Sequence, residues 1–201
     1  MTLHPTRRGL LGQLSAAALL AALPLPGFAL TTDQASALVG TLVADINQVI
    51  NSGRSEAQMF PEFERIFQRY ADVPTIARST LGPDARRASA AQLQAFTTAF
   101  RSYISRKYGK RFREFIGGAI EVKSARAVKS FHEVNCIVRL TGEAPFAIIF
   151  LVSDQGGSDK FFDMLIEGIS LLKSERTEIG AMIDRRGGDL DAMIRDLARA
   201  G

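Results

Sequence analysis

Phe146-Ala147-Ile148-Ile149-Phe150-Leu151-Val152 is apolar along its whole length and consists mainly of β-branched and aromatic residues. These residue types favour strands, and an uninterrupted apolar strand is typical of the centre of a sheet or of a sheet covered on both faces. In the preceding stretch, Val134-Asn135-Cys136-Ile137-Val138-Arg139-Leu140, apolar residues alternate with mostly polar ones, which indicates a strand with one wet face. The two stretches predict neighbouring strands of one sheet.

Turn residues divide the surrounding segment into four predicted strands. Four ranges are rich in Val, Ile and Phe: 119–128, 133–141, 145–154 and 159–171. Gly142 and the run Gln155-Gly156-Gly157-Ser158 have the composition of hairpin turns. Because short turns join antiparallel neighbours, we expect a four-stranded antiparallel meander.

Apolar residues at helical spacing mark the remaining segments. The predicted helices are 33–52 (capped by Thr32 or Asp33), 55–70, a short helix opened by Pro74, a long helix from Ser89 to Gly117, and two C-terminal helices at 176–186 and 190–197. Helices, then a meander, then helices predict a single α+β domain in which the long helix packs on a curved antiparallel sheet. A strongly bent sheet wrapped by one long helix tends to leave a cone-shaped interior.

The first 29 residues have the organisation of a cleavable export signal. Arg7 and Arg8 precede an uncharged run from Leu14 to Leu25, which is too short to cross a bilayer, and small residues follow at Gly27 and Ala29. We expect cleavage near Ala29, a working domain of residues 30–201, and a location outside the cytoplasm. The paired arginines suit the twin-arginine route, although general export stays open.

Composition excludes several classes of function. The formal charge of +4 includes Arg7 and Arg8, so about +2 is left after cleavage, too little to indicate nucleic-acid binding. Cys136 is the only cysteine and lies among apolar residues, so we expect a buried, unreactive thiol. With His4 removed, His132 is the only histidine, and a His/Cys metal cluster cannot form.

Asp163 is the one candidate for catalysis, because it lies within the apolar run Phe161-Phe162-Asp163-Met164-Leu165-Ile166. A carboxyl group in apolar surroundings has a raised pKa and can act as a general acid or base. A small isomerase or dehydratase on a cone-shaped fold is therefore the alternative function. The structural interpretation, which we favour, places Asp163 and Glu167 together on a solvated or ion-paired strand face.

An excess of phenylalanine without tryptophan suggests an apolar pocket, although a solid core would have the same composition. Smooth walls of Phe, Ile and Leu suit alkyl chains. The candidate pocket residues come from the predicted helices and strands: Ile76, Phe96, Phe100, Tyr103, Ile104, Tyr108, Phe112, Val138, Leu140, Phe146, Ile148, Phe150, Met164 and Ile166. The alternation leaves open whether Ile148 or its neighbours Ala147 and Ile149 face the interior.

Four segments, in order along the chain, resemble the signature of the MlaC family, also called the toluene-tolerance family. They are Asp72-Val73-Pro74-Thr75-Ile76-Ala77-Arg78-Ser79-Thr80-Leu81-Gly82 with the Ala88-Ser89-Ala90-Ala91-Gln92 that follows; Phe112-Arg113-Glu114-Phe115-Ile116-Gly117-Gly118-Ala119-Ile120; Asp163 with Ile166-Glu167-Gly168-Ile169-Ser170-Leu171; and Arg176 with the terminal helix. Together they span nearly the whole predicted mature chain.

The resemblance implies a periplasmic phospholipid-binding protein with an NTF2-like cone, a monomer and not an enzyme. It implies a carrier that moves phospholipid between an outer-membrane lipoprotein complex and an inner-membrane ABC transporter complex, which maintains the lipid asymmetry of the outer membrane. No cofactor, metal or nucleic acid is implied. A related branch accompanies hopanoid synthesis genes, so a hopanoid-related lipid stays open.

The chain departs from the family pattern in three places. Ala85 stands where the family commonly has tryptophan, Ser174-Glu175 replaces an Asn-Tyr pair, and Ile179 replaces an aromatic residue. Arg176 follows the second of these departures at the predicted start of a C-terminal helix. We hypothesise that Arg176 pairs with Asp163 or Glu167 and shapes the mouth of the pocket.

Overall fold

The computed structural model describes residues 30–201, with the side chains of 111–113 excepted. The predicted signal peptide at 1–29 lies outside the described residues. Within them, the helices are α1 (Thr32–Ile50), α2 (Glu56–Tyr70), α3 (Val73–Leu81), α4 (Ala90–Gly109), α5 (Leu171–Arg185) and α6 (Leu190–Leu197), with 3₁₀ turns η1 (Gly82–Arg86) and η2 (Lys110–Phe115). The strands are β1 (Ala119–Val128), β2 (Phe131–Arg139), β3 (Phe146–Ser153), β4 (Lys160–Ile166) and β5 (Ile169–Ser170).

The strands form one antiparallel sheet in the order β1-β2-β3-β4-β5, so the predicted α+β meander is confirmed with five strands instead of four. The predicted last strand, 159–171, is broken at Glu167 and Gly168, whose φ angles are 48° and 81°. Two consecutive residues with positive φ make a tight hairpin, and Ile166 therefore pairs with Ile169 in β5.

The central strand β3 divides its apolar residues between two unlike faces. Ile148 and Phe150 are buried on the concave face of the sheet, whereas Ala147 is exposed and Ile149 is half-buried on the other. β3 is therefore central, as predicted, and the structure resolves which neighbours face inward. Cys136 pairs with Ile148 and is fully buried, and burial raises the pKa of its thiol to about 12, which keeps it protonated and unreactive.

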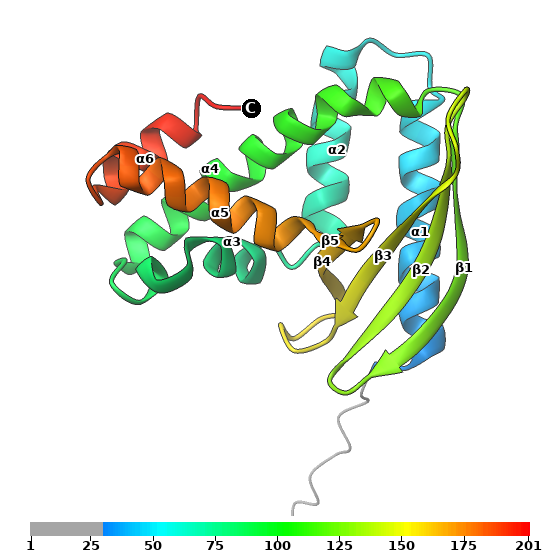
Figure 1. Cartoon of the computed structure of the whole chain (residues 1–201), viewed down its shortest axis with the longest axis horizontal. Coiled ribbons are helices and arrows are strands. Elements are labelled where there is room, and N and C mark those ends of the chain that lie inside the picture. Colours follow the sequence, from blue (N-terminus) through cyan, green and yellow to red (C-terminus); the bar gives the residue numbers. More distant parts are fainter. Residues whose placement is uncertain (1–29) are drawn as a thin grey trace, which may run out of the picture.

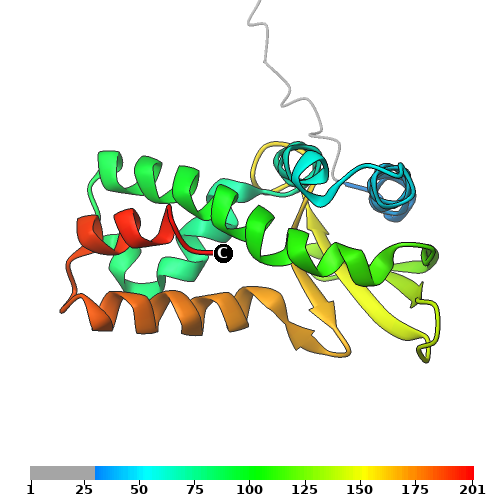
Figure 2. The same cartoon turned by 90° about the horizontal axis from the view of Figure 1, so that it is seen from above.

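Figure 1 shows α1 lying along the sheet and α3, α5 and α6 toward the other end of the molecule, while α4 runs from that end to the top of the sheet. α1 contacts β1 and β2, and its Asn47 side chain bonds to both the carbonyl and the N–H of Ile120 at 3.3 and 3.4 Å. Figure 2 shows α1 and α2 on one side of the molecule, α5 on the other, and α4 running between them along its length.

The long predicted helix is α4 followed by η2, so it ends as an α-helix at Gly109 and not at Gly117. Its predicted cap is confirmed, because Ser89 Oγ accepts a hydrogen bond from the Gln92 N–H. The cap of α1 lies one residue earlier than predicted, at Thr31. At Gly109 the helix crosses α2 so closely that a Cβ would come within 2.6 Å of the Phe60 ring.

A buried polar cluster holds α4 against α5. Glu175 on α5 is buried and accepts hydrogen bonds from Lys107 Nζ at 2.7 Å and from the Tyr108 hydroxyl at 2.5 Å. Lys107 also pairs with Glu178, which accepts a bond from the Tyr103 hydroxyl at 2.8 Å. Burial, followed by these acceptor carboxylates, raises the pKa of both tyrosines well above the usual value of 10.0.

This cluster predicts a loss of stability in alkali. The third tyrosine, Tyr70, also has a raised pKa, because it is partly desolvated and donates a hydrogen bond to Asp45. Folded tyrosines therefore keep their protons where unfolded ones lose them, so their contribution to stability is complete below pH 10 and is lost as the pH rises further. We expect tyrosinate absorbance to appear only as circular dichroism reports unfolding. Titration of Tyr103 and Tyr108 near pH 10 in a protein that remains folded would contradict the cluster.

Candidate functional site

An apolar cavity of about 380 Å³ lies between the concave face of the sheet and the helices that cross it. Most of its wall is aliphatic or aromatic. The helices and η2 contribute Leu42, Ile46, Phe63, Ile66, Phe67, Ile104, Phe115 and Leu171, and the strands with the β2–β3 connection contribute Ile120, Leu140, Phe146, Ile148, Phe150, Phe161, Met164 and Ile166. The volume lies within the range of small-molecule sites, and the wall suits an apolar ligand.

The polar residues of the wall are Ser105, Tyr108, Glu114, Glu143 and Glu167. Glu143 and Glu167 are exposed and also line the cavity, so the cavity opens to solvent between the β2–β3 and β4–β5 turns. These turns lie close together, because the Glu167 N–H donates to the carbonyl of Ala147 at 3.0 Å. Among the described side chains, no arginine or lysine lines this opening.

The structure brings together eight of the residues predicted to form the pocket. They are Ile104, Tyr108, Leu140, Phe146, Ile148, Phe150, Met164 and Ile166. The side chain of Phe112 lies outside the described part of the chain.

Five predicted pocket residues lie elsewhere, in solid packing: Ile76, Phe96, Phe100, Tyr103 and Val138. Phe96, Phe100 and Tyr103 are on the part of α4 that lies among α3, α5 and α6, and only the last turns of α4 reach the sheet. Val138 is on the concave face but belongs to β2, against which α1 packs.

Sequence reasoning missed the contribution of the first two helices. Leu42 and Ile46 of α1 and Phe63, Ile66 and Phe67 of α2 all line the cavity. Their three- and four-residue spacing identified one apolar stripe on each helix. The spacing contains no signal that distinguishes a stripe facing a cavity from a stripe facing solid core.

Asp163 is a structural anchor for α5. It is buried, its Oδ1 accepts hydrogen bonds from the N–H groups of Met164 at 2.7 Å and Leu172 at 2.9 Å, and its Oδ2 accepts one from the Ser170 hydroxyl at 2.6 Å. Ser170 is the N-cap of α5, so the carboxylate satisfies free donors at the positive end of this helix. Both oxygens are occupied and neither lines the cavity, which is the opposite of what a general base requires.

The hypothesis that Arg176 pairs with Asp163 or Glu167 is wrong. Glu167 lies in the tight turn and faces the cavity, so it does not share a face with Asp163. Arg176 lies against Gly82, where a Cβ would come within 3.0 Å of the guanidinium. Arg176 therefore packs α5 against the end of α3, away from the opening.

No three histidine, cysteine or carboxylate side chains among the described residues are grouped so that they could hold a metal ion. Among the same residues, no helix combines the length and the apolar character needed to cross a bilayer.

The anchor predicts a specific loss of stability. Asp163→Asn replaces one carboxylate oxygen, which accepts hydrogen bonds, by an NH₂ group, which can only donate them. At least one hydrogen bond is lost, so the free energy of unfolding should fall by about 1–3 kcal/mol. Asp159→Asn is the matched control, because Asp159 is exposed in the turn before the same strand, and its effect should stay within about 0.5 kcal/mol. Urea unfolding followed by circular dichroism measures both. Equal stability of the two variants would contradict the anchoring role.

The chain is similar to proteins of a known family. The chain matches the family model described as MlaC protein over residues 39–199. It is 27% identical over 194 residues to toluene tolerance protein ttg2D of Pseudomonas putida, a match that covers 94% of this chain and 87% of that relative.

The fold also resembles a solved structure. The phospholipid-binding protein from Ralstonia solanacearum, determined in complex with a phospholipid, superposes with a TM-score of 0.68 and 24% sequence identity, covering 82% of this chain and 98% of that one. At this identity the likeness establishes the fold. The family model, by contrast, spans the helices, the sheet and the cavity residues together, and on that ground the chain belongs to the MlaC family.

Proposed function

We propose that this protein is a lipid carrier that encloses the acyl chains of a phospholipid in its apolar cavity. The observation that carries the proposal is the cavity itself, a space walled by aromatic and aliphatic side chains, open at one end and found in a member of the MlaC family. The Ralstonia solanacearum protein of the same fold was determined with a phospholipid bound, which supports the same class of ligand here.

The energetics of such a ligand explain why the wall is apolar. Two acyl chains of roughly fifteen methylenes each, at about 0.8 kcal/mol per methylene, would cost on the order of 24 kcal/mol if exposed to water. A carrier must therefore enclose them almost completely. It must also release them to a membrane or a partner, and apolar walls with few hydrogen-bonding groups hold the chains about as well as a bilayer does.

The route of transport extends the proposal. The carrier works in the periplasm after removal of residues 1–29, and exchanges lipid with an outer-membrane lipoprotein complex and an inner-membrane ABC transporter complex. This exchange serves the lipid asymmetry of the outer membrane. Because the lipid is about as stable in the cavity as in a bilayer, the affinity of the cavity does not set the direction of transfer. That direction comes from docking to these partners.

The proposal predicts that a bulky side chain placed inside the cavity displaces the lipid. Met164 lines the cavity and Leu165 faces the other side of the same strand, so Met164→Trp and Leu165→Trp form a matched pair. The indole at 164 competes with an acyl chain for space at a cost of about 1–3 kcal/mol, and retention of lipid should fall about tenfold.

Native mass spectrometry of the protein purified from the cell envelope measures the bound lipid and identifies its class. The natural chain and Leu165→Trp should carry phospholipid, and circular dichroism should report a folded Met164→Trp variant. Absence of any lipid from the natural chain, or equal loading of the two variants, would overturn the proposed function. If the bound lipid is a hopanoid, the protein is still a lipid carrier, but its ligand is not a phospholipid.

A further inference from the structure

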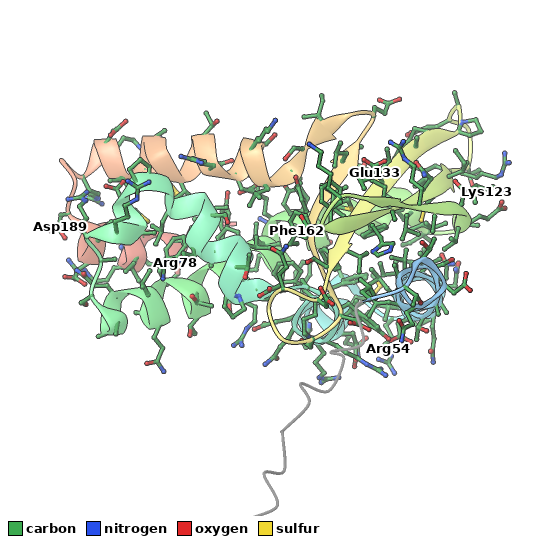
Figure 3. All side chains as sticks on the ribbon, turned by 90° about the horizontal axis from the view of Figure 1, so that it is seen from below. Arg54, Arg78, Lys123, Glu133, Phe162 and Asp189 are labelled. Atoms are coloured by element: carbon green, nitrogen blue, oxygen red, sulfur yellow. The ribbon has the colours of Figure 1, made fainter. Side chains whose placement is uncertain are left out.

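A second hollow, of about 410 Å³, lies between α1 and α2 and differs in chemistry from the cavity. Its wall includes three arginines, Arg54, Arg65 and Arg69, and two carboxylates, Asp45 and Glu62. Figure 3 shows Arg54 on the side of α1 that is turned away from the strands. We call this hollow the arginine groove.

The arginine groove carries one positive charge in excess, since three guanidinium groups face two carboxylates. Glu62 is shared between Arg65 at 2.6 Å and Arg54 at 3.2 Å, so it cannot neutralise both. Asp45 lies 3.4 Å from Arg69 and also accepts a hydrogen bond from the Tyr70 hydroxyl at 2.6 Å.

The guanidinium groups of the groove remain accessible. The side chains of Arg65 and Arg69 are each 68% exposed, and that of Arg54 is 52% exposed. Each guanidinium has five N–H donors, so most of these donors are free to meet an anion. Planar guanidinium groups match phosphate oxygens in bidentate geometry.

One residue lies at the border between the arginine groove and the cavity. Ile66 lines both, whereas its helix neighbours Phe63 and Phe67 line the cavity and Arg65 and Arg69 line the groove. α2 therefore presents an apolar face to the cavity and a basic face to the groove, with Ile66 at the border. An amphiphile that crossed this border would have its chains in the cavity and its anionic group among the arginines.

The described side chains at the other opening present carboxylates, not cations, to a phosphate. Glu143 and Glu167 are exposed there, and neither forms an ion pair with a described residue. A phosphate placed at that opening would face carboxylates, whereas one placed in the arginine groove would neutralise its excess charge. A phosphodiester carries one negative charge, which equals this excess.

We propose that the arginine groove is a phosphate site, in which a phosphodiester lipid places its phosphate among Arg54, Arg65 and Arg69 while its acyl chains pass Ile66 into the cavity. The lipid part of this inference rests on the proposed carrier function. The same groove would accept inorganic phosphate, so the experiment separates the two sources.

Paramagnetic broadening of phosphorus NMR signals locates the phosphate directly. Nitroxide labels are attached to Thr41→Cys, on α1 one turn before Asp45, or to Ile169→Cys, beside Glu167, each combined with Cys136→Ala and loaded with dioleoyl phosphatidylglycerol. Thr41 and Ile169 are exposed and belong to α1 and β5, which lie on opposite sides of the molecule (Figure 2). The label at 41 should broaden the lipid phosphorus signal more than the label at 169, and the reverse order would overturn the inference.

Charge reversal tests the arginines themselves. Arg65→Glu combined with Arg69→Glu should weaken retention of phosphatidylglycerol about tenfold and leave retention of dioleoylglycerol, which has no phosphate, unchanged. Arg195→Glu combined with Arg199→Glu, on and just after α6, is the control of equal charge change and should affect neither lipid. An equal loss of both lipids in the groove variant would overturn the phosphate site, because only the fold or the cavity would then have changed.

Inorganic phosphate separates this inference from the carrier function. Titrated into lipid-free protein labelled at 41, it should show saturable broadening that Arg65→Glu with Arg69→Glu abolishes. If no lipid binds at all, the carrier function fails, and this titration alone decides the phosphate site. Broadening that does not saturate, or that survives charge reversal, would overturn it.

Discussion

The shape of the interior depends on the carboxylate of Asp163, which fixes the point where α5 leaves the sheet. Its three hydrogen bonds end the short β5 hairpin and begin α5 in one step, and α5 then runs away from the concave face toward α3 and α6. α1 contacts β3, and α3 and α5 contact β4, while the cavity lies between the inner face of these strands and the helices that cross it. The wall residues of the cavity are as apolar as those of the solid core, so residue type does not explain why a cavity forms here. The direction in which α5 leaves the sheet does.

The sequence specified the elements more closely than the cavity. Strand alternation and turn residues predicted the meander, and capping residues predicted helix starts, because these signals act over a few neighbouring positions. Phe100 and Phe150 show where such signals stop. Both are buried aromatics on regular stripes, yet Phe100 is in solid packing and Phe150 lines the cavity, since α4 meets other helices at Phe100. That difference depends on how distant segments cross, which periodicity does not contain. The family resemblance supplied the expectation of a lipid pocket that the pattern alone left open.

The walls of the cavity differ in how firmly they are held. On one side, α4 and α5 are joined by the buried Glu175, and removing Lys107 would leave that carboxylate without its cation, a loss of about 3–5 kcal/mol in comparable buried pairs. On the other side, the ion pair between α1 and α2 joins Arg69 to Asp45 at 3.4 Å with Arg69 largely exposed. Exposed pairs of this kind contribute about 0–1 kcal/mol.

This asymmetry decides which wall can yield to a ligand. α1 is fixed to β1 through the two hydrogen bonds of Asn47, and α4 is fixed to α5 through the buried Glu175. The seam between α1 and α2 is held by the exposed Arg69–Asp45 pair and by the hydrogen bond from the Tyr70 hydroxyl to Asp45. It is also where Ile66 separates the cavity from the arginine groove. Widening this seam would stretch the exposed Arg69–Asp45 pair and the hydrogen bond from Tyr70 to the partly exposed Asp45, whereas widening the α4–α5 side would strip hydrogen bonds from the buried Glu175. A lipid that entered at the seam would therefore leave the buried carboxylate of Glu175 undisturbed and would meet the arginines of the groove in the same place.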